Sequence, residues 1–228
     1  MARIPAPVTT SEEVSAVAEL GERERAAVSQ MFQDAARPVH VRVVLPGGPG
    51  PGPKTGFRAA VAELAEMVPL ISVTECSPAE AGAVVERTPA VALFDGEGND
   101  LRVRFYGLPT GYEFSSFLAA LADAAAPQSA LQPETLRALQ SLEQDVQIKV
   151  FSTPSCPYCP RAVRLGSQMA LASPRVSTEA IDAAHFSALA GLYQVRGVPR
   201  TVFNRRLHLE GAVPEATFLQ NVLAAAGA

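Results

Sequence analysis

The chain has few of the residues that common binding and scaffold chemistries require. Its 228 residues include three cysteines, three histidines and no tryptophan, and Lys54 and Lys149 are its only lysines. Three cysteines cannot build the dense disulfide framework of a small secreted domain. Because the net charge is −4 and no long basic run occurs, nucleic acid is not expected as a partner.

Long apolar stretches are absent as well. No apolar run reaches the roughly eighteen residues of a membrane helix, and the stretch from Met1 to Pro7 lacks the apolar core of a signal peptide. We therefore expect no membrane segment and a cytoplasmic protein. Hydrophobic residues make up 48% of the chain and charged residues 18%, which predicts a folded protein with room for two ordinary domains.

The most informative stretch is Cys-Pro-Tyr-Cys at residues 156–159, which pairs two of the three cysteines. Residues 147–151 alternate as a short strand, residues 152–155 form a turn, and apolar residues recur with helical spacing after the pair. We expect Cys156 at the start of that helix, where the unpaired N–H groups and the helix dipole favour a thiolate. Cys156 would then be the exposed nucleophile and Cys159 the resolving thiol, as in thiol–disulfide oxidoreductases.

Three other interpretations of the cysteine pair remain open. A structural zinc site usually needs four ligands, and neither a second C-x-x-C nor a nearby histidine pair is present, so no metal is expected. A static disulfide would fit a secreted protein, which nothing else here suggests. A chance C-x-x-C is the third alternative. No G-x-G-x-x-G follows any expected strand, so no nucleotide cofactor is expected either.

A second feature, about forty residues downstream, favours the active-site interpretation. Residues 196–204 contain a Val-Pro that opens a β-branched and aromatic run, although proline cannot donate to a strand ladder. Together with the cysteine pair, this segment resembles the thioredoxin and glutaredoxin superfamily. The resemblance implies a cis peptide between Val198 and Pro199 that faces the cysteines and receives the substrate chain. It also implies that Pro157 and Tyr158 shape the exposed rim.

The first half of the chain repeats the second half without its cysteines. The strand, the x-Pro segment and the last helix each have a counterpart about 107 residues earlier, which includes residues 40–44 and Thr88-Pro89. Such a period indicates duplication. In this register the two cysteines fall on Pro49 and Gly52, so the first half is expected to be redox-silent.

Each half is expected to begin with a helix, at residues 11–36 and at residues 133–145. The alanine-rich segment 124–130 is the expected linker. The fold class that follows is α/β, with two tandem thioredoxin-like domains, each a central mixed β-sheet flanked by helices. We place the redox-silent domain at residues 1–125 and the active domain at residues 126–228.

This arrangement resembles the protein disulfide oxidoreductases, or glutaredoxin-like proteins, of archaea and bacteria. Residues 104–109 and 211–218 look like theirs, and the resemblance covers residues 11–226. It implies reduction or exchange of protein disulfides, with a thioredoxin-reductase-like flavoenzyme as electron donor. A tandem chain with a C-x-x-C in its second domain alone also resembles the N-terminal tandem domain of flavin-dependent alkyl hydroperoxide reductases. This resemblance implies an electron adapter to a peroxiredoxin. A non-catalytic, redox-sensing binding platform is a further alternative.

The chain departs from thioredoxins and glutaredoxins at two places, and its remaining cysteine is a separate feature. Val150 occupies the position of the buried acid of thioredoxins, so another acid or water must take the proton from Cys159. Residues 211–215 hold one glycine and one acid, fewer than glutaredoxins use to hold glutathione, which is therefore not expected as the main substrate. Cys76 precedes an S-x-x-E capping box at residues 77–80 and is expected to be a buried apolar side chain.

Overall fold

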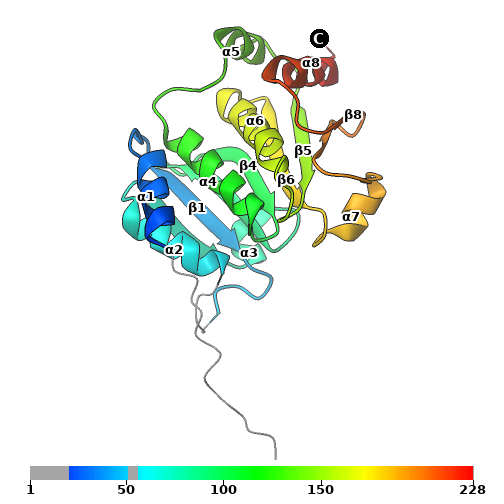
Figure 1. Ribbon diagram of the computed structural model, residues 1–228. Helices are drawn as coiled ribbons and strands as arrows, with labels where there is room; N and C mark the ends of the chain where they lie inside the picture. The colour runs from blue at the N-terminus through cyan, green and yellow to red at the C-terminus, as the bar shows by residue number, and fades with distance from the viewer. Residues whose placement is uncertain (1–20, 51–55, 228) are drawn as a thin grey trace, which may run out of the picture.

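One mixed sheet of eight strands runs through both halves of the chain (Figure 1). The computed structural model describes residues 21–50 and 56–227. Its strands are β1 (Val39–Val44), β2 (Ile71–Cys76), β3 (Ala90–Asp95), β4 (Asp100–Tyr106), β5 (Val146–Ser152), β6 (Val176–Asp182), β7 (Arg200–Phe203) and β8 (Leu207–Glu210). Its helices are α1 (Glu22–Met31), α2 (Phe57–Met67), α3 (Pro78–Ala81), the 3-10 turn η1 (Gly82–Val84), α4 (Tyr112–Ala125), α5 (Pro133–Gln140), α6 (Cys159–Ala172), α7 (Ser187–Leu192) and α8 (Glu215–Ala226).

The two halves contribute equivalent sets of strands, in the order β2-β1-β3-β4-β6-β5-β7-β8. In the first half, β1 pairs in parallel with β2 and antiparallel with β3, and in the second half β5 does the same with β6 and β7. The predicted mixed sheet flanked by helices is confirmed. The structure adds that parallel pairing of β4 with β6 makes the two sheets continuous.

Helices cover both faces of this sheet, and the core is accordingly split in two. The larger cluster lies between the sheet and the helices that include α4, α6 and α8, with Phe117, Met169 and Phe218 fully buried. The smaller cluster contains Ala81 of α3 and Ala190 of α7. Helices α4 and α6 pack side by side across the junction of the halves (Figure 1). This contact brings the start of α4 next to the start of α6.

Arg102 of β4 joins the halves by hydrogen bonds to main-chain carbonyls of the second half. Its Nε donates to Val176 at 3.1 Å, and its Nη2 donates to Ala170 at 3.1 Å and to Ser173 at 3.2 Å. We expect Arg102→Ala to lower the free energy of unfolding by about 2–4 kcal/mol, because hydrogen bonds from a charged group are lost. Urea unfolding measures this. The exposed Arg137→Ala is the control and should cost less than about 1 kcal/mol; equal losses would contradict the assignment.

Most predicted elements are present with small shifts in their ends. The strand expected at residues 147–151 is β5, and the last helix of the repeat is α8. Helix α5 ends at Gln140, short of the predicted residue 145, because Leu142 leaves the helix and is buried in the core.

Helix α1 ends at Met31, short of residue 36, and Phe32 beyond it is buried. Its predicted start lies outside the described residues, as does Gly52, one of the two positions that the repeat aligns with the cysteines. The domain boundary at residues 125/126 falls at the end of α4 and stays a prediction.

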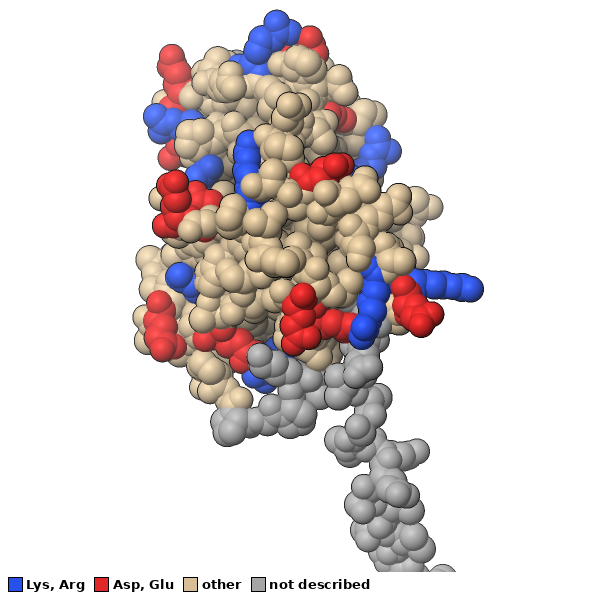
Figure 2. All heavy atoms as spheres, turned by 90° about the vertical axis from the view of Figure 1, so that its left-hand side faces the viewer, with Lys and Arg blue, Asp and Glu red and all other residues tan. Residues whose placement is uncertain are grey.

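The surface carries charges of both signs. Figure 2 shows acidic and basic side chains interspersed on one face, and the described basic residues there form no continuous patch. Within the part of the chain that the structure describes, no helix has the length and apolar character needed to cross a membrane.

Candidate redox site

The two cysteines of the second half form a disulfide where β5 leads into α6. Cys156 and Cys159 have Cα atoms 5.5 Å apart, within the range of protein disulfides. Cys156 is 7% exposed and Cys159 only 1% exposed. The expectation of an openly exposed Cys156 is therefore too strong while its sulfur is bonded to Cys159, although Cys156 remains the more accessible of the two.

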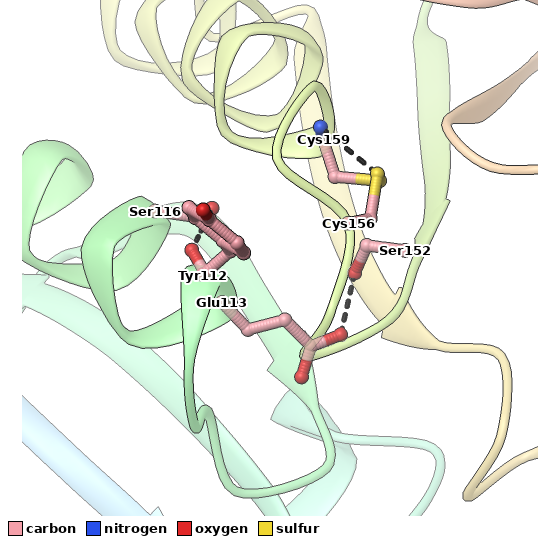
Figure 3. Close-up of a disulfide and its surroundings, with 6 residues drawn as sticks. All are labelled: Tyr112, Glu113, Ser116, Ser152, Cys156 and Cys159. Atoms are coloured by element: carbon pink, nitrogen blue, oxygen red, sulfur yellow. Dashed lines mark hydrogen bonds between the residues drawn. A yellow bond between two sulfur atoms is a disulfide. The ribbon is translucent and has the colours of Figure 1, made fainter.

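The helix starts later than predicted. Helix α6 begins at Cys159, and Cys156 belongs to the preceding turn, because its N–H donates to the carbonyl of Thr153 at 3.1 Å. The N–H of Cys159 nevertheless points at the Cys156 sulfur, at 3.1 Å (Figure 3). This donor at the helix N-terminus favours a thiolate on Cys156 once the disulfide is reduced.

The predicted cis peptide between Val198 and Pro199 is present, at the entrance to β7. Its counterpart in the first half, Thr88-Pro89, is cis as well, as the internal repeat implies. A groove beside the cis proline runs from Val198 and Thr153 to α7. Its lining is Thr153, Ala183, Ala184, Ser187, Ala190, Gly191, Val195, Arg196, Gly197 and Val198. Most of these side chains are small, so an extended chain has room beside Val198.

The rim residues Pro157 and Tyr158 are both exposed, and Tyr158 is 71% exposed. Arg164 of α6 pairs with Asp123 of α4 through contacts of 2.8 Å and 2.9 Å, on the side of the helix that faces solvent. Arg164 therefore joins α4 to α6, and its charge is paired with Asp123 instead of with a group at the disulfide.

A carboxyl group from the first half reaches the site, and the sequence did not reveal it. Glu113, in the first turn of α4, extends toward the end of β5 below the disulfide and accepts a hydrogen bond from the Ser152 hydroxyl at 2.7 Å (Figure 3). Glu113 is only 6% exposed. Val150 is fully buried and apolar, so the acid of this site comes from the other half of the chain.

A small cavity of about 10 Å³ lies next to Glu113 and is large enough for roughly one water molecule. Its polar lining comprises Glu113, Ser116, Ser152 and Asp182. Burial raises the pKa of Glu113 to about 7; the hydrogen bond from Ser152 lowers the pKa, and the charge of Asp182 raises it further. Glu113 is therefore poised to gain or lose a proton near neutral pH.

This shift predicts a measurable pH dependence of stability. The pKa of Glu113 rises from 4.5 to about 7 on folding, so the folded protein binds more protons than the unfolded chain between these values. Stability should therefore fall as pH rises from about 4.5 to 7, by on the order of 3 kcal/mol. Glu113→Gln cannot ionise, so its free energy of unfolding relative to the wild type should rise across the same window. A difference independent of pH in urea unfolding would contradict the shift.

Two further side chains, Cys76 and His40, have ordinary structural roles. Cys76 is buried and unpaired at the end of β2, and the capping box that follows it is formed by Ser77 and Glu80, as predicted. His40 lies in β1 between the hydroxyls of Ser72 and Thr74, at 2.9 Å and 2.6 Å.

Comparisons with known proteins place this geometry among thioredoxin folds. Residues 146–224 match a family model described as a thioredoxin domain. The F subunit of the alkyl hydroperoxide reductase of Xanthomonas campestris pv. phaseoli is 34% identical over 126 residues, covering 55% of this chain and 24% of that protein. The Pseudomonas putida protein of the same name is 28% identical over 162 residues, 71% of this chain and 31% of that protein. The chain thus spans about a quarter to a third of these relatives.

Two solved structures cover nearly the whole chain. A protein disulfide oxidoreductase from Aeropyrum pernix superposes with a TM-score of 0.78 at 29% identity, over 92% of this chain and 94% of that one. The NTD_N/C domain of alkylhydroperoxide reductase AhpF from Enterococcus faecalis also gives 0.78, at 21% identity over 89% and 99% of the two chains, and this likeness shows the fold alone. Residues 146–224 therefore form a thioredoxin domain, within a tandem thioredoxin-fold chain that carries a redox-type cysteine pair.

Proposed function

We propose that this protein is a dithiol–disulfide oxidoreductase that reduces or exchanges disulfides of other proteins. The observation that carries the proposal is the Cys156–Cys159 disulfide at a helix N-terminus with the buried carboxyl of Glu113 below it. A purely structural disulfide needs no buried acid at its side. Burying such a carboxyl costs stability, which fits a group kept for its proton chemistry.

The first step is attack by the Cys156 thiolate on one sulfur of a substrate disulfide. A bond forms between Cys156 and that sulfur, the substrate S–S bond breaks, and the other substrate sulfur leaves as a thiolate that takes up a proton. The N–H of Cys159 and the end of α6 stabilise the attacking thiolate. The product is a mixed disulfide between Cys156 and the substrate.

The second step resolves the mixed disulfide. Cys159 loses its thiol proton to Glu113 and attacks Cys156, so the Cys156–Cys159 bond forms and the bond between Cys156 and the substrate breaks. The second substrate sulfur leaves as a thiolate and takes up a proton, which Glu113 can return. Ser152 holds the Glu113 carboxyl in place by donating its hydroxyl. Two electrons have then passed from the protein to the substrate, whose two sulfurs have each taken up a proton.

The substrate chain would lie against the backbone of Val198 and Pro199, in the groove between this loop and α7. The edge N–H and C=O groups of an extended chain pair there as an added strand would. Pro157 and Tyr158 would contact the residues that flank the substrate cysteine. A thioredoxin-reductase-like flavoenzyme in the cytoplasm would return the protein to its dithiol form.

A second candidate function is electron transfer to a peroxiredoxin. The specific support is the likeness to the F subunits of alkyl hydroperoxide reductases, of which this chain matches a limited part. The chemistry at Cys156 and Cys159 is the same, and the disulfide of a peroxiredoxin replaces the general protein substrate. A reduced protein that passes electrons to a peroxiredoxin much faster than to insulin would favour this role.

Reduction of insulin disulfides by dithiothreitol tests the proposed function. The wild type is expected to accelerate the reaction, and a variant with both Cys156→Ser and Cys159→Ser should be no faster than dithiothreitol alone. Equal rates for both proteins would refute the proposal. A reduction potential near or below about −230 mV would place the protein with the reductases, and one above about −180 mV with oxidants or isomerases.

A further inference from the structure

The start of α4, from the first half, is built against the active-site loop. The N–H of Tyr112 donates to the carbonyl of Pro154 at 2.9 Å. Gly111 before it has a φ of +53°, and a Cβ there would lie 2.5 Å from the same carbonyl oxygen. Only glycine therefore allows this close approach. The next residue, Glu113, reaches under the disulfide, so three consecutive residues of the silent half face the loop that carries Cys156.

The ring of Tyr112 is not part of the hydrophobic core. It is 47% exposed, and within residues 21–50 and 56–227 the exposed large hydrophobic side chains are Met31, Tyr112, Tyr158 and Leu192. Two of these four belong to the segments that meet at the disulfide. The Tyr112 hydroxyl has no hydrogen-bond partner among the described residues, and its main-chain oxygen accepts from Ser116 at 3.0 Å (Figure 3). Exposed tyrosines of this kind often anchor partner proteins.

The exposed residues of the two segments that meet at the disulfide carry no charge, and exposed arginines lie outside them, Arg161 in α6 and Arg196 in the groove beside Val198. We define the active-site rim as the exposed residues of segments 110–115 and 153–160, namely Thr110, Gly111, Tyr112, Ser115, Ser155, Pro157 and Tyr158. The acid of these segments, Glu113, is buried beneath the rim. The rim itself offers no charged partner, so the part of a segment that contacts the rim fits best when it is uncharged.

We propose that Tyr112 is a specificity-determining residue of the redox site. Together with Tyr158 it contacts an extended, uncharged segment that carries an apolar side chain near the disulfide cysteine of a protein substrate. The silent half then selects substrates as well as supplying Glu113. The inference rests on the proposed function, because it assigns the kind of protein disulfide that the Cys156–Cys159 pair accepts.

Steady-state kinetics with two substrates test it. Tyr112→Ala is expected to raise KM for insulin by about 5- to 30-fold, and to change kcat/KM for bis(2-hydroxyethyl) disulfide by less than about twofold, because this small molecule cannot span the rim. Tyr112→Phe should behave as the wild type, since the ring makes the contact. Met31→Ala, which removes an exposed side chain on α1, is the matched control and should change neither substrate.

A pair of peptide disulfides adds a test that needs no variant. One peptide carries leucine and the other glutamate two residues from the cystine. The wild type should favour the leucine peptide by at least about fivefold in kcat/KM, and Tyr112→Ala should remove most of that preference.

The outcomes separate the two proposals. A wild type that reduces both insulin and the small disulfide, with Tyr112→Ala equal to it on both, would overturn the role of Tyr112 and leave the proposed function standing. A variant that loses both substrates equally would show a structural role for Tyr112 instead and would also overturn the inference. A wild type that reduces neither substrate would overturn the proposed function and this inference with it.

Discussion

Replacing Cys159 by serine is expected to trap substrate proteins on Cys156. In this variant the attacking thiol remains, so the mixed disulfide forms, and the thiol that resolves it is missing. Non-reducing electrophoresis should then show covalent complexes that dithiothreitol releases. Multiple turnover with insulin should fall by roughly a hundredfold or more, to the rate at which external thiol alone resolves the complex.

The partner variant, Cys156→Ser, should form no complexes and should be inactive. The difference follows from position, because Cys156 is the more accessible sulfur and receives the N–H of Cys159. Cys76→Ser is the control for the remaining thiol and should match the wild type. Complexes that form on Cys159 in the Cys156→Ser protein would reverse the assignment of attacking and resolving thiols.

Replacing Glu113 by glutamine should slow the resolving step without changing the attack by Cys156. In the proposed mechanism the carboxylate accepts the proton that Cys159 loses, and general base catalysis of this kind contributes about 10²- to 10⁴-fold. Because burial raises the pKa of Glu113 to about 7, the wild-type rate of resolution should increase with pH up to about 7 and then level off. The inflection should be absent in Glu113→Gln.

Rapid mixing of the reduced protein with a fluorescent disulfide substrate separates the two steps. Formation of the mixed disulfide should be similar in the wild type and in Glu113→Gln, and only its decay should differ. Glu97→Gln, a change of an exposed carboxylate in the turn between β3 and β4, is the matched control. An unchanged rate of decay and an unchanged pH profile in Glu113→Gln would show that another group takes the proton.

The repeat explains how much of the fold could be predicted. Strand periodicity, the C-x-x-C and the two x-Pro segments each depend on local sequence. They predicted β1, β5 and the helix after the cysteines, and the family resemblance that they carry implied the cis peptide at Val198-Pro199. The continuity of the sheet could not be read in this way. It depends on the pairing of Val103 in β4 with Thr178 in β6, two residues far apart in sequence.

Glu113 was missed for a related reason, although the sequence holds a signal for it. Glu113 lies on the same face of α4 as Phe117, Ala120 and Ala124, which are all buried. The helical spacing of these apolar residues therefore places an acid on the buried face of the helix. The first half holds no counterpart of the two cysteines, so the repeat predicts a redox-silent half. Nothing in the repeat indicates that an acid on the buried face of a helix in this half lies near the cysteines of the other half.

Thiol counting after a single turnover tests the central claim most directly. Fully reduced protein is mixed with excess insulin, quenched by alkylation and digested for mass spectrometry. The account predicts that Cys156 and Cys159 are recovered as a disulfide in one peptide, that insulin gains the corresponding thiols, and that Cys76 stays reduced. Recovery of Cys156 and Cys159 as alkylated thiols, with insulin unreduced, would contradict it.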